Sequence, residues 1–261
     1  GSEIPIVIVD VQRLGPSTGS ATRGADGDIH FLRWGSSGGL PVIVLAPVDV
    51  KDCFNLTVAA FNLAEEFRCP VFIASNKEIG MTKESFDLAS ATLPPLVERT
   101  LYTGDQYLPF EADPDKAPPF LPIGGKTLVR QTSSTHGPDG FITIDPQTIA
   151  ANQQRLRTKL HAARERISLY EENILPDTDT LVISYGITSR AVEDAAKMLA
   201  AKGNPISTLS LKTLWPVPEQ AILKAAANFK RVVVIEMNLG QYINEIRRIL
   251  CGKCIDFYGQ M

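Results

Sequence analysis

The C-terminal part of the chain alternates short apolar runs with amphipathic segments, and this alternation constrains the fold more than any other feature. The apolar runs are rich in β-branched residues, whereas the segments between them place apolar residues three and four positions apart. We expect strands at 180–186, 206–211 and 231–237, and helices at 189–202, 218–228 and 241–250. Strands that alternate with helices are typical of a parallel sheet covered by helices, so the sequence predicts an α/β domain over 176–261.

The first part of the chain, residues 1–95, carries a shorter α/β pattern. Apolar runs at 4–9, 42–45 and 71–74 predict three strands, which we expect to be buried on both faces. Asp49 stands where the N-cap of a helix between the last two strands belongs. The apolar positions of that helix are Cys53, Leu56, Ala60, Leu63, Ala64 and Phe67. These elements are too few for a whole domain, so we expect a further portion of it upstream of residue 1.

Residues 96–175 separate the two patterns. Prolines are frequent between 92 and 150 and apolar periodicity is weak, which predicts an extended excursion with little regular structure. Residues 152–172 then predict a connecting helix. Its apolar face would consist of Leu156, Leu160, Ala163, Ile167 and Tyr170.

Composition excludes several classes of function. Of the 261 residues, 44% are hydrophobic and 21% are charged, as in an ordinary globular protein. The 26 basic and 29 acidic residues form no basic block, which removes the electrostatic footprint of a nucleic-acid-binding protein. No apolar stretch approaches the roughly 20 residues that cross a bilayer. We therefore expect neither a nucleic-acid nor a membrane partner, and a cytoplasmic location.

The four cysteines are too few for a disulfide framework. Cys53 and Cys69 lie in apolar segments and are interpreted as core residues. Cys251 and Cys254 form a single C-x-x-C motif, which lacks the two further ligands of a structural zinc or iron-sulfur site. This motif is compatible with two incidental thiols or with redox or shared metal chemistry.

The stretch VQRLGPSTGSATRG, residues 11–24, concentrates hydrogen-bonding groups directly after the first apolar run. Arg13 carries a planar fork suited to a carboxylate or phosphate, and Ser17, Thr18 and Thr22 add hydroxyls. In open parallel sheets ligands bind at the carboxyl ends of strands, which is where this stretch falls. The residues alone leave two interpretations, an anion-binding loop or a structural turn with a surface arginine. We call residues 13–24 the polar loop.

Two further motifs favour structural roles. Asp26, Gly27 and Asp28 do not have the order of a diphosphate and metal motif, and we interpret them as a polar turn. His136 lies in the proline-rich excursion without an evident carboxylate or cysteine partner, which favours a hydrogen-bonded loop histidine over a catalytic one. We expect no metal ligands in this chain.

Six stretches of the chain together resemble the α subunit of the 2-oxoacid:ferredoxin oxidoreductases. They are VIVDVQRLGPSTGSATR, GDIHFLRWG, CFNLTVAAFNLAEEFRCPVFIASNKEIGMT, VISYGITSRAVEDAAKMLAAKG, LKTLWPVPEQAI and VVVIEMNLGQ. The resemblance covers nearly the entire chain. It implies part of a thiamine pyrimidine-binding domain with a parallel sheet, followed by a transketolase-C-terminal-like α/β domain.

The resemblance also implies an activity, the oxidative decarboxylation of a 2-oxoacid to an acyl-CoA with electrons passed to ferredoxin. Thiamine diphosphate would be shared with a partner β subunit that holds magnesium and a 4Fe-4S cluster, and coenzyme A would be a co-substrate. Arg13 matches the family arginine that contacts the substrate carboxylate, and Thr22 matches a residue of the oxoacid pocket. Ser17 and Thr18 are further pocket candidates, and no residue of this chain is assigned as catalytic.

This chain departs from the family pattern within the polar loop. Leu14, Ser20 and Ala21 stand where the family commonly has glycine, leucine and proline, so the resemblance does not identify the oxoacid. The family's Tyr-Pro-Ile-Thr-Pro segment and thiamine-activating glutamate would lie upstream of residue 1. Two other functions stay open: a pyrimidine-domain subunit of another thiamine enzyme, such as a 2-oxoacid dehydrogenase or a transketolase-like enzyme, and a non-catalytic subunit.

Overall fold

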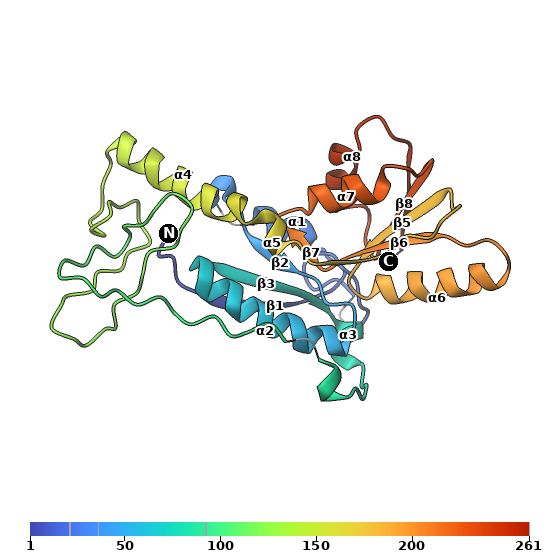
Figure 1. Cartoon of the computed structure of the whole chain (residues 1–261), viewed down its shortest axis with the longest axis horizontal. Helices are drawn as coiled ribbons and strands as arrows, with labels where there is room; N and C mark the ends of the chain where they lie inside the picture. Colours follow the sequence, from blue (N-terminus) through green and yellow to red (C-terminus); the bar gives the residue numbers. More distant parts are fainter. Residues whose placement is uncertain (21, 36, 92, 261) are drawn as a thin grey trace.

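Two sheets organise the chain in the computed structural model, which describes all residues except 21, 36, 92 and 261 (Figure 1). The first sheet has the order β1 (Ile6–Gln12), β3 (Pro70–Asn76), β2 (Ile43–Leu45), β7 (Thr213–Trp215). The second has the order β4 (Tyr170–Asn173), β6 (Ser207–Leu211), β5 (Thr180–Tyr185), β8 (Arg231–Glu236), β9 (Ile255–Gly259). Each sheet is parallel apart from one antiparallel edge strand, β7 in the first and β4 in the second. The predicted α/β class is therefore confirmed.

Helices form at the positions that the apolar periodicity predicts. They are α2 (Val50–Phe67), α6 (Thr188–Ala201), α7 (Glu219–Ala226) and α8 (Ile243–Ile249). The predicted cap of α2 is confirmed, since the Asp49 side chain accepts a hydrogen bond from the backbone N–H of Asp52 at 2.7 Å. Leu56, Ala60 and Phe67 of α2 are buried in the same cluster as residues of β2 and β3. No helix within the described part of the chain is long and apolar enough to span a bilayer.

One apolar core joins the two halves of the chain. Val44 of β2 and Ala74 of β3 belong to the same buried cluster as Leu181 of β5 and Trp215 of β7. Strand β7 comes from the C-terminal half in sequence but pairs with β2 of the first sheet. The two sheets consequently hold each other in place, and the domain limits 1–95, 96–175 and 176–261 stay a prediction.

The connecting helix differs from its predicted extent of 152–172. It begins earlier, as α4 (Pro146–Ala162), because the Asp145 side chain caps the helix by accepting from the N–H of Thr148 at 2.7 Å. The short α5 (Arg164–Ile167) follows, and Tyr170 already belongs to β4. The prediction of a continuous helix is wrong at its end because residues 170–173 pair antiparallel with β6, a partner that lies far away in sequence.

Strand β1 corrects the expectation that all early strands are buried on both faces. It forms an edge of the first sheet, and the side chains of Val9 and Val11 are 58% and 55% exposed. By contrast, Ile43 and Val44 in the interior of the same sheet have no exposed surface. The apolar run at 4–9 indicates a strand, but its place within the sheet decides how much of that strand is covered.

Several short elements have no counterpart in the sequence analysis. They include α1 (Ile29–Trp34), α3 (Lys77–Met81), β7 and β9. α1 has 6 residues and α3 has 5, which is too short for apolar periodicity to stand out. β9 completes the edge of the second sheet by parallel pairing with β8, from Val232 with Ile255 to Glu236 with Gly259.

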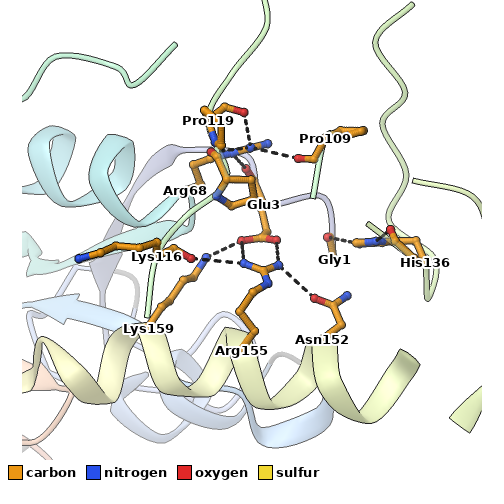
Figure 2. A network of polar contacts seen from close by, with 12 residues as sticks. Gly1, Glu3, Arg68, Pro109, Lys116, Pro119, His136, Asn152, Arg155 and Lys159 are labelled. Atoms are coloured by element: carbon orange, nitrogen blue, oxygen red, sulfur yellow. Dashed lines mark hydrogen bonds and ion pairs between the residues drawn. The ribbon is translucent and has the colours of Figure 1, made fainter. Parts of the chain in front are cut away.

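A buried polar network fixes the proline-rich excursion, whose described residues 93–145 form no helix or strand. Figure 2 shows the carboxylate of Glu3 between Arg155 and Lys159 of α4. Lys159 Nζ lies 2.7 Å from one Glu3 oxygen, and both Arg155 terminal nitrogens contact the carboxylate. Arg68, at the end of α2, donates to the carbonyl oxygens of Glu3 at 3.0 Å and Pro118 at 2.9 Å. These contacts tie the first residues, the excursion and α4 together.

Candidate functional site

The polar loop lies at the carboxyl end of β1, where its sequence position predicts it. Arg13 and Gly24 form an isolated antiparallel bridge that closes the base of the loop. The backbone N–H of Gly24 donates to Glu78 of α3 at 3.1 Å, and the Lys77 ammonium donates to the carbonyl oxygen of Thr22. The loop is thus anchored on α3, which follows the neighbouring strand β3.

A tight turn shapes the tip of the loop. The N–H of Gly19 donates to Pro16 O at 3.0 Å, and the N–H of Ser20 donates to Leu14 O at 3.2 Å. Gly19 has a φ of +53°, and a Cβ atom at this position would lie only 1.5 Å from Leu14 O. Glycine is therefore required here, and Ser17 and Thr18 within the turn are exposed.

The four predicted site residues belong to one exposed loop. Arg13, Ser17, Thr18 and Thr22 are all exposed. Among the described residues, their side chains have no hydrogen-bond or ion-pair partner, so their donors are available to a ligand. Ala21, which departs from the family pattern, lies outside the described residues. The assignment of the four residues to a substrate site stays a prediction.

A buried carboxylic acid lies directly behind the loop, and the sequence analysis missed it. Asp26 is only 2% exposed, and its Oδ1 accepts from the Asn76 amide at 2.9 Å. Its Oδ2 has no partner among the described residues. Burial raises the pKa of Asp26 to about 7; the Asn76 hydrogen bond opposes this rise, and the charge of Glu236 adds to it. The predicted turn is present at Gly27 and Asp28, but Asp26 itself is buried beside the fully buried Ala25 and Ile29, which the sequence did not indicate.

Residues 236–241, EMNLGQ, meet the segment that follows the polar loop. The buried Glu236 carboxylate accepts from the N–H groups of Tyr242 at 2.9 Å and Ile243 at 2.7 Å, and so caps the start of α8. It also accepts from the Tyr185 hydroxyl at 2.8 Å. Asn238 donates to the same hydroxyl at 2.8 Å and to Asp26 O at 2.9 Å. Gln241 of this segment also contacts Gly27 and His30, so two of the stretches that carry the family resemblance are in direct contact, although they are more than 200 residues apart.

The other candidate residues have no visible role in chemistry. The ring nitrogens of His136 lie 3.0 Å from Gly137 O and 3.2 Å from Gly1 O, and its ring stacks on Phe110. The favoured interpretation of a hydrogen-bonded loop histidine is confirmed. Cys251 and Cys254 are exposed and free, which leaves their role open. Within the described ranges, no three histidine, cysteine, aspartate or glutamate side chains come close enough to hold a metal ion.

The fold is α/β, and the polar loop places exposed donors at the carboxyl edge of a parallel sheet, where proteins of this class commonly bind ligands. Comparison with known proteins identifies the family within this class. The thiamine-diphosphate-binding family of pyruvate flavodoxin/ferredoxin oxidoreductases matches residues 1–155, and core domain II of pyruvate:ferredoxin oxidoreductase matches residues 178–261. The chain belongs to the α subunits of the 2-oxoacid:ferredoxin oxidoreductases, which confirms the resemblance seen in the sequence.

Individual relatives are consistent with this assignment. The 2-oxoglutarate synthase subunit KorA of Methanothermobacter thermautotrophicus is 37% identical over 96% of this chain and 67% of its own length. The KorA subunit of Archaeoglobus fulgidus is 34% identical over 100% of this chain and 69% of its own. The ketoisovalerate oxidoreductase subunit VorB of M. thermautotrophicus is 26% identical over 98% of this chain and 65% of its own. The chain thus spans about two thirds of the length of these relatives.

A solved structure has the same fold. The 2-oxoglutarate:ferredoxin oxidoreductase from Magnetococcus marinus, determined with 2-oxoglutarate, coenzyme A and succinyl-CoA bound, superimposes with a TM-score of 0.88. Its sequence is 27% identical, and the match covers 99% of this chain but 46% of the other. The arrangement of both sheets is therefore that of a 2-oxoacid-converting enzyme.

Proposed function

We propose that this chain is the α subunit of a complex that oxidatively decarboxylates a 2-oxoacid to an acyl-CoA and passes the electrons to ferredoxin. The observation that carries the proposal is the 37% identity to 2-oxoglutarate synthase subunits over almost the whole chain. The bond between the carboxylate and the carbonyl carbon breaks, carbon dioxide leaves, the acyl group goes to coenzyme A, and two electrons leave one at a time. Because the relatives of higher identity are named for 2-oxoglutarate, this is the oxoacid to test first.

In this proposal the polar loop binds the oxoacid. The Arg13 guanidinium offers two parallel N–H donors, which match the two oxygens of a carboxylate. Ser17, Thr18 and Thr22 supply exposed hydroxyls from the same loop. The chain's own contribution is therefore to hold and orient the substrate at the carboxyl edge of the first sheet.

The cofactors would be held mainly outside this chain. A magnesium ion bound to the diphosphate of thiamine needs several oxygen ligands. The described residues contain no group of three histidine, cysteine, aspartate or glutamate side chains that could hold a metal ion, so they offer no evident site for that end of the cofactor. We propose that a partner β subunit provides the magnesium site and a 4Fe-4S cluster, while coenzyme A and ferredoxin act as co-substrate and electron acceptor. A cytoplasmic location also stays part of this proposal.

The activity can be tested with the complex assembled from the full-length subunits. Mixed with 2-oxoglutarate and coenzyme A, it should reduce ferredoxin or a viologen dye, with formation of the acyl-CoA in proportion. Transfer of the acyl group to lipoamide or a sugar in place of dye reduction would indicate another thiamine enzyme. Absence of turnover with every 2-oxoacid would leave a non-catalytic subunit.

Replacing Arg13 by alanine should raise the KM of the complex for the oxoacid by roughly 10- to 100-fold, because a charge-assisted hydrogen-bonded pair contributes about 1.5–3 kcal/mol. Arg13→Lys keeps the charge but loses the two parallel N–H donors, so its KM should lie between the KM of the wild type and that of Arg13→Ala. Arg23→Ala is the matched control, since Arg23 is an exposed arginine near the end of the same loop. Steady-state kinetics measure the change. An equal rise of KM in the Arg13→Ala and Arg23→Ala variants would contradict a specific carboxylate contact.

A further inference from the structure

The segment between the polar loop and α1 is held by a side chain from the other half of the molecule. The Gln241 amide donates from Nε2 to Gly27 O at 2.6 Å and accepts at Oε1 from the N–H of His30 at 2.7 Å. The Gln241 backbone oxygen also lies 2.9 Å from His30 Nε2. Gln241 thus makes one contact with this segment and two with His30 in the first turn of α1, although it is 211 residues away from His30 in sequence.

These contacts supply what the local sequence lacks. α1 begins after Asp28, whose side chain makes no capping hydrogen bond. The first N–H groups of a helix have no partner within the helix and need one from elsewhere. Gln241 provides that partner for His30, so α1 is capped by a side chain from a distant segment.

Gln241 is itself fixed before it reaches the segment. Its backbone N–H donates to Asn238 Oδ1 at 3.1 Å and to Glu236 Oε2 at 3.2 Å. The side-chain amide of Asn238 additionally donates to the backbone carbonyl oxygen of Asp26. We call the contacts of Gln241 with Gly27 and His30 the clamp. The clamp therefore rests on the start of α8, which the Glu236 carboxylate caps.

The clamp reaches Arg13 through one further close contact. Gly27 packs against the backbone of Arg13, since a Cβ on Gly27 would lie 2.4 Å from Arg13 O. The amide of Gln241 holds the carbonyl group of this same glycine. Gln241, Gly27 and Arg13 thus form a continuous line of contact from the second half to the predicted carboxylate-binding residue.

We infer that Gln241 is a positioning residue for the polar loop: it fixes Gly27 and thereby the place of Arg13 relative to the substrate. This inference rests on the proposed function, because it takes Arg13 to be the group that binds the oxoacid. Displacement of a binding group by about 1 Å is enough to weaken its contact with the substrate strongly. The effect of losing Gln241 should accordingly fall on oxoacid binding.

Gln241→Met tests this in the assembled complex, because methionine has a similar length and makes neither amide hydrogen bond. We expect KM for the oxoacid to rise roughly 3- to 30-fold, as for the loss of one or two hydrogen bonds. We expect kcat and the KM for coenzyme A to change by less than about twofold. Gln220→Met is the matched control, since Gln220 is an exposed glutamine of α7 in the same half, and it should leave all constants unchanged.

A double-mutant cycle separates positioning from a general structural effect. If Gln241 acts through Arg13, the Arg13→Ala, Gln241→Met double variant should have nearly the KM of Arg13→Ala alone. Fully additive effects on KM, or an equal fall of kcat for all substrates, would overturn the inference.

Hydrogen exchange provides a readout that does not depend on turnover. In the Gln241→Met complex the amides of residues 13–30 should exchange faster, while those of β5 keep their protection. Unchanged exchange in 13–30 would also overturn the inference. An inactive wild-type complex would refute the proposed function instead, so the two failures are distinguishable.

Discussion

Replacing Glu3 by glutamine should lower the free energy of unfolding by about 3–5 kcal/mol, the usual cost of removing one partner from a buried ion pair. The Glu3 side chain is 2% exposed and faces Arg155 and Lys159, whose side chains are 9% and 2% exposed. Glutamine cannot neutralise these two cations, and it leaves both of them buried without a counter-ion (Figure 2). The N-terminal segment, the excursion and α4 should loosen together.

Denaturant unfolding of the chain measures this effect, with Glu66→Gln as the matched control. Glu66 pairs with Arg166 at the surface, where the arginine is 58% exposed, and such pairs contribute about 0–1 kcal/mol. Equal losses of stability in the two variants would show that the buried network does not stabilise the fold. A variant with Glu3, Arg155 and Lys159 all replaced by apolar residues should recover part of the loss, because the two cations that face Glu3 are then removed together with it.

The Glu3 network should also weaken in acid. Burial alone would raise the pKa of Glu3, but the hydrogen bonds and charges of Arg155 and Lys159 lower it below the usual value. A carboxylate with a lowered pKa stabilises the folded state above its unfolded pKa, and this contribution is lost as the pH falls through the folded pKa. The difference in stability between wild type and Glu3→Gln should therefore shrink in acid.

The stability difference between wild type and an Asp26→Asn variant should depend on pH in the direction opposite to that for Glu3→Gln. The folded pKa of Asp26 is raised from 3.8 to about 7 by burial and by Glu236, with Asn76 opposing. The folded chain then binds more protons than the unfolded chain between these values, so the wild type loses roughly 4 kcal/mol of stability as the pH rises from 4 to 8. The Asp26→Asn variant lacks this loss, because its amide does not titrate.

The measurement is the difference in unfolding free energy between wild type and Asp26→Asn as a function of pH. It should shift in favour of the variant by about 4 kcal/mol from pH 4 to pH 8. Asp105→Asn, at an exposed position in the excursion, is the control and should follow the wild type. Parallel curves for wild type and Asp26→Asn would mean that Asp26 does not titrate within this range. The Tyr185 hydroxyl, which contacts Glu236, stays protonated throughout because burial raises its pKa well above the usual value.

Sequence patterns by themselves determined the α/β class, helix α2 with its Asp49 cap, and most elements of the second sheet. These features are encoded locally, since apolar periodicity and capping residues act within a few positions of each other. The location of the polar loop also followed from the sequence, because a loop after a parallel strand must lie at the carboxyl edge of the sheet. That Arg13, Ser17, Thr18 and Thr22 lie in one exposed loop follows from their closeness in sequence.

Only the tertiary structure decided which polar groups are buried and what they contact. Arg155 and Lys159 lie on the covered face of α4 because Glu3, more than 150 residues away, supplies their counter-charge. β1 occupies an edge of its sheet and leaves Val9 and Val11 exposed, whereas β7 at the other edge is buried, a difference that the apolar sequences do not reveal. Asp26 is buried, and Gly27 is clamped by Gln241, because the second half packs against the base of the polar loop. Such contacts depend on partners that are distant in sequence, and no local pattern of residues specifies them.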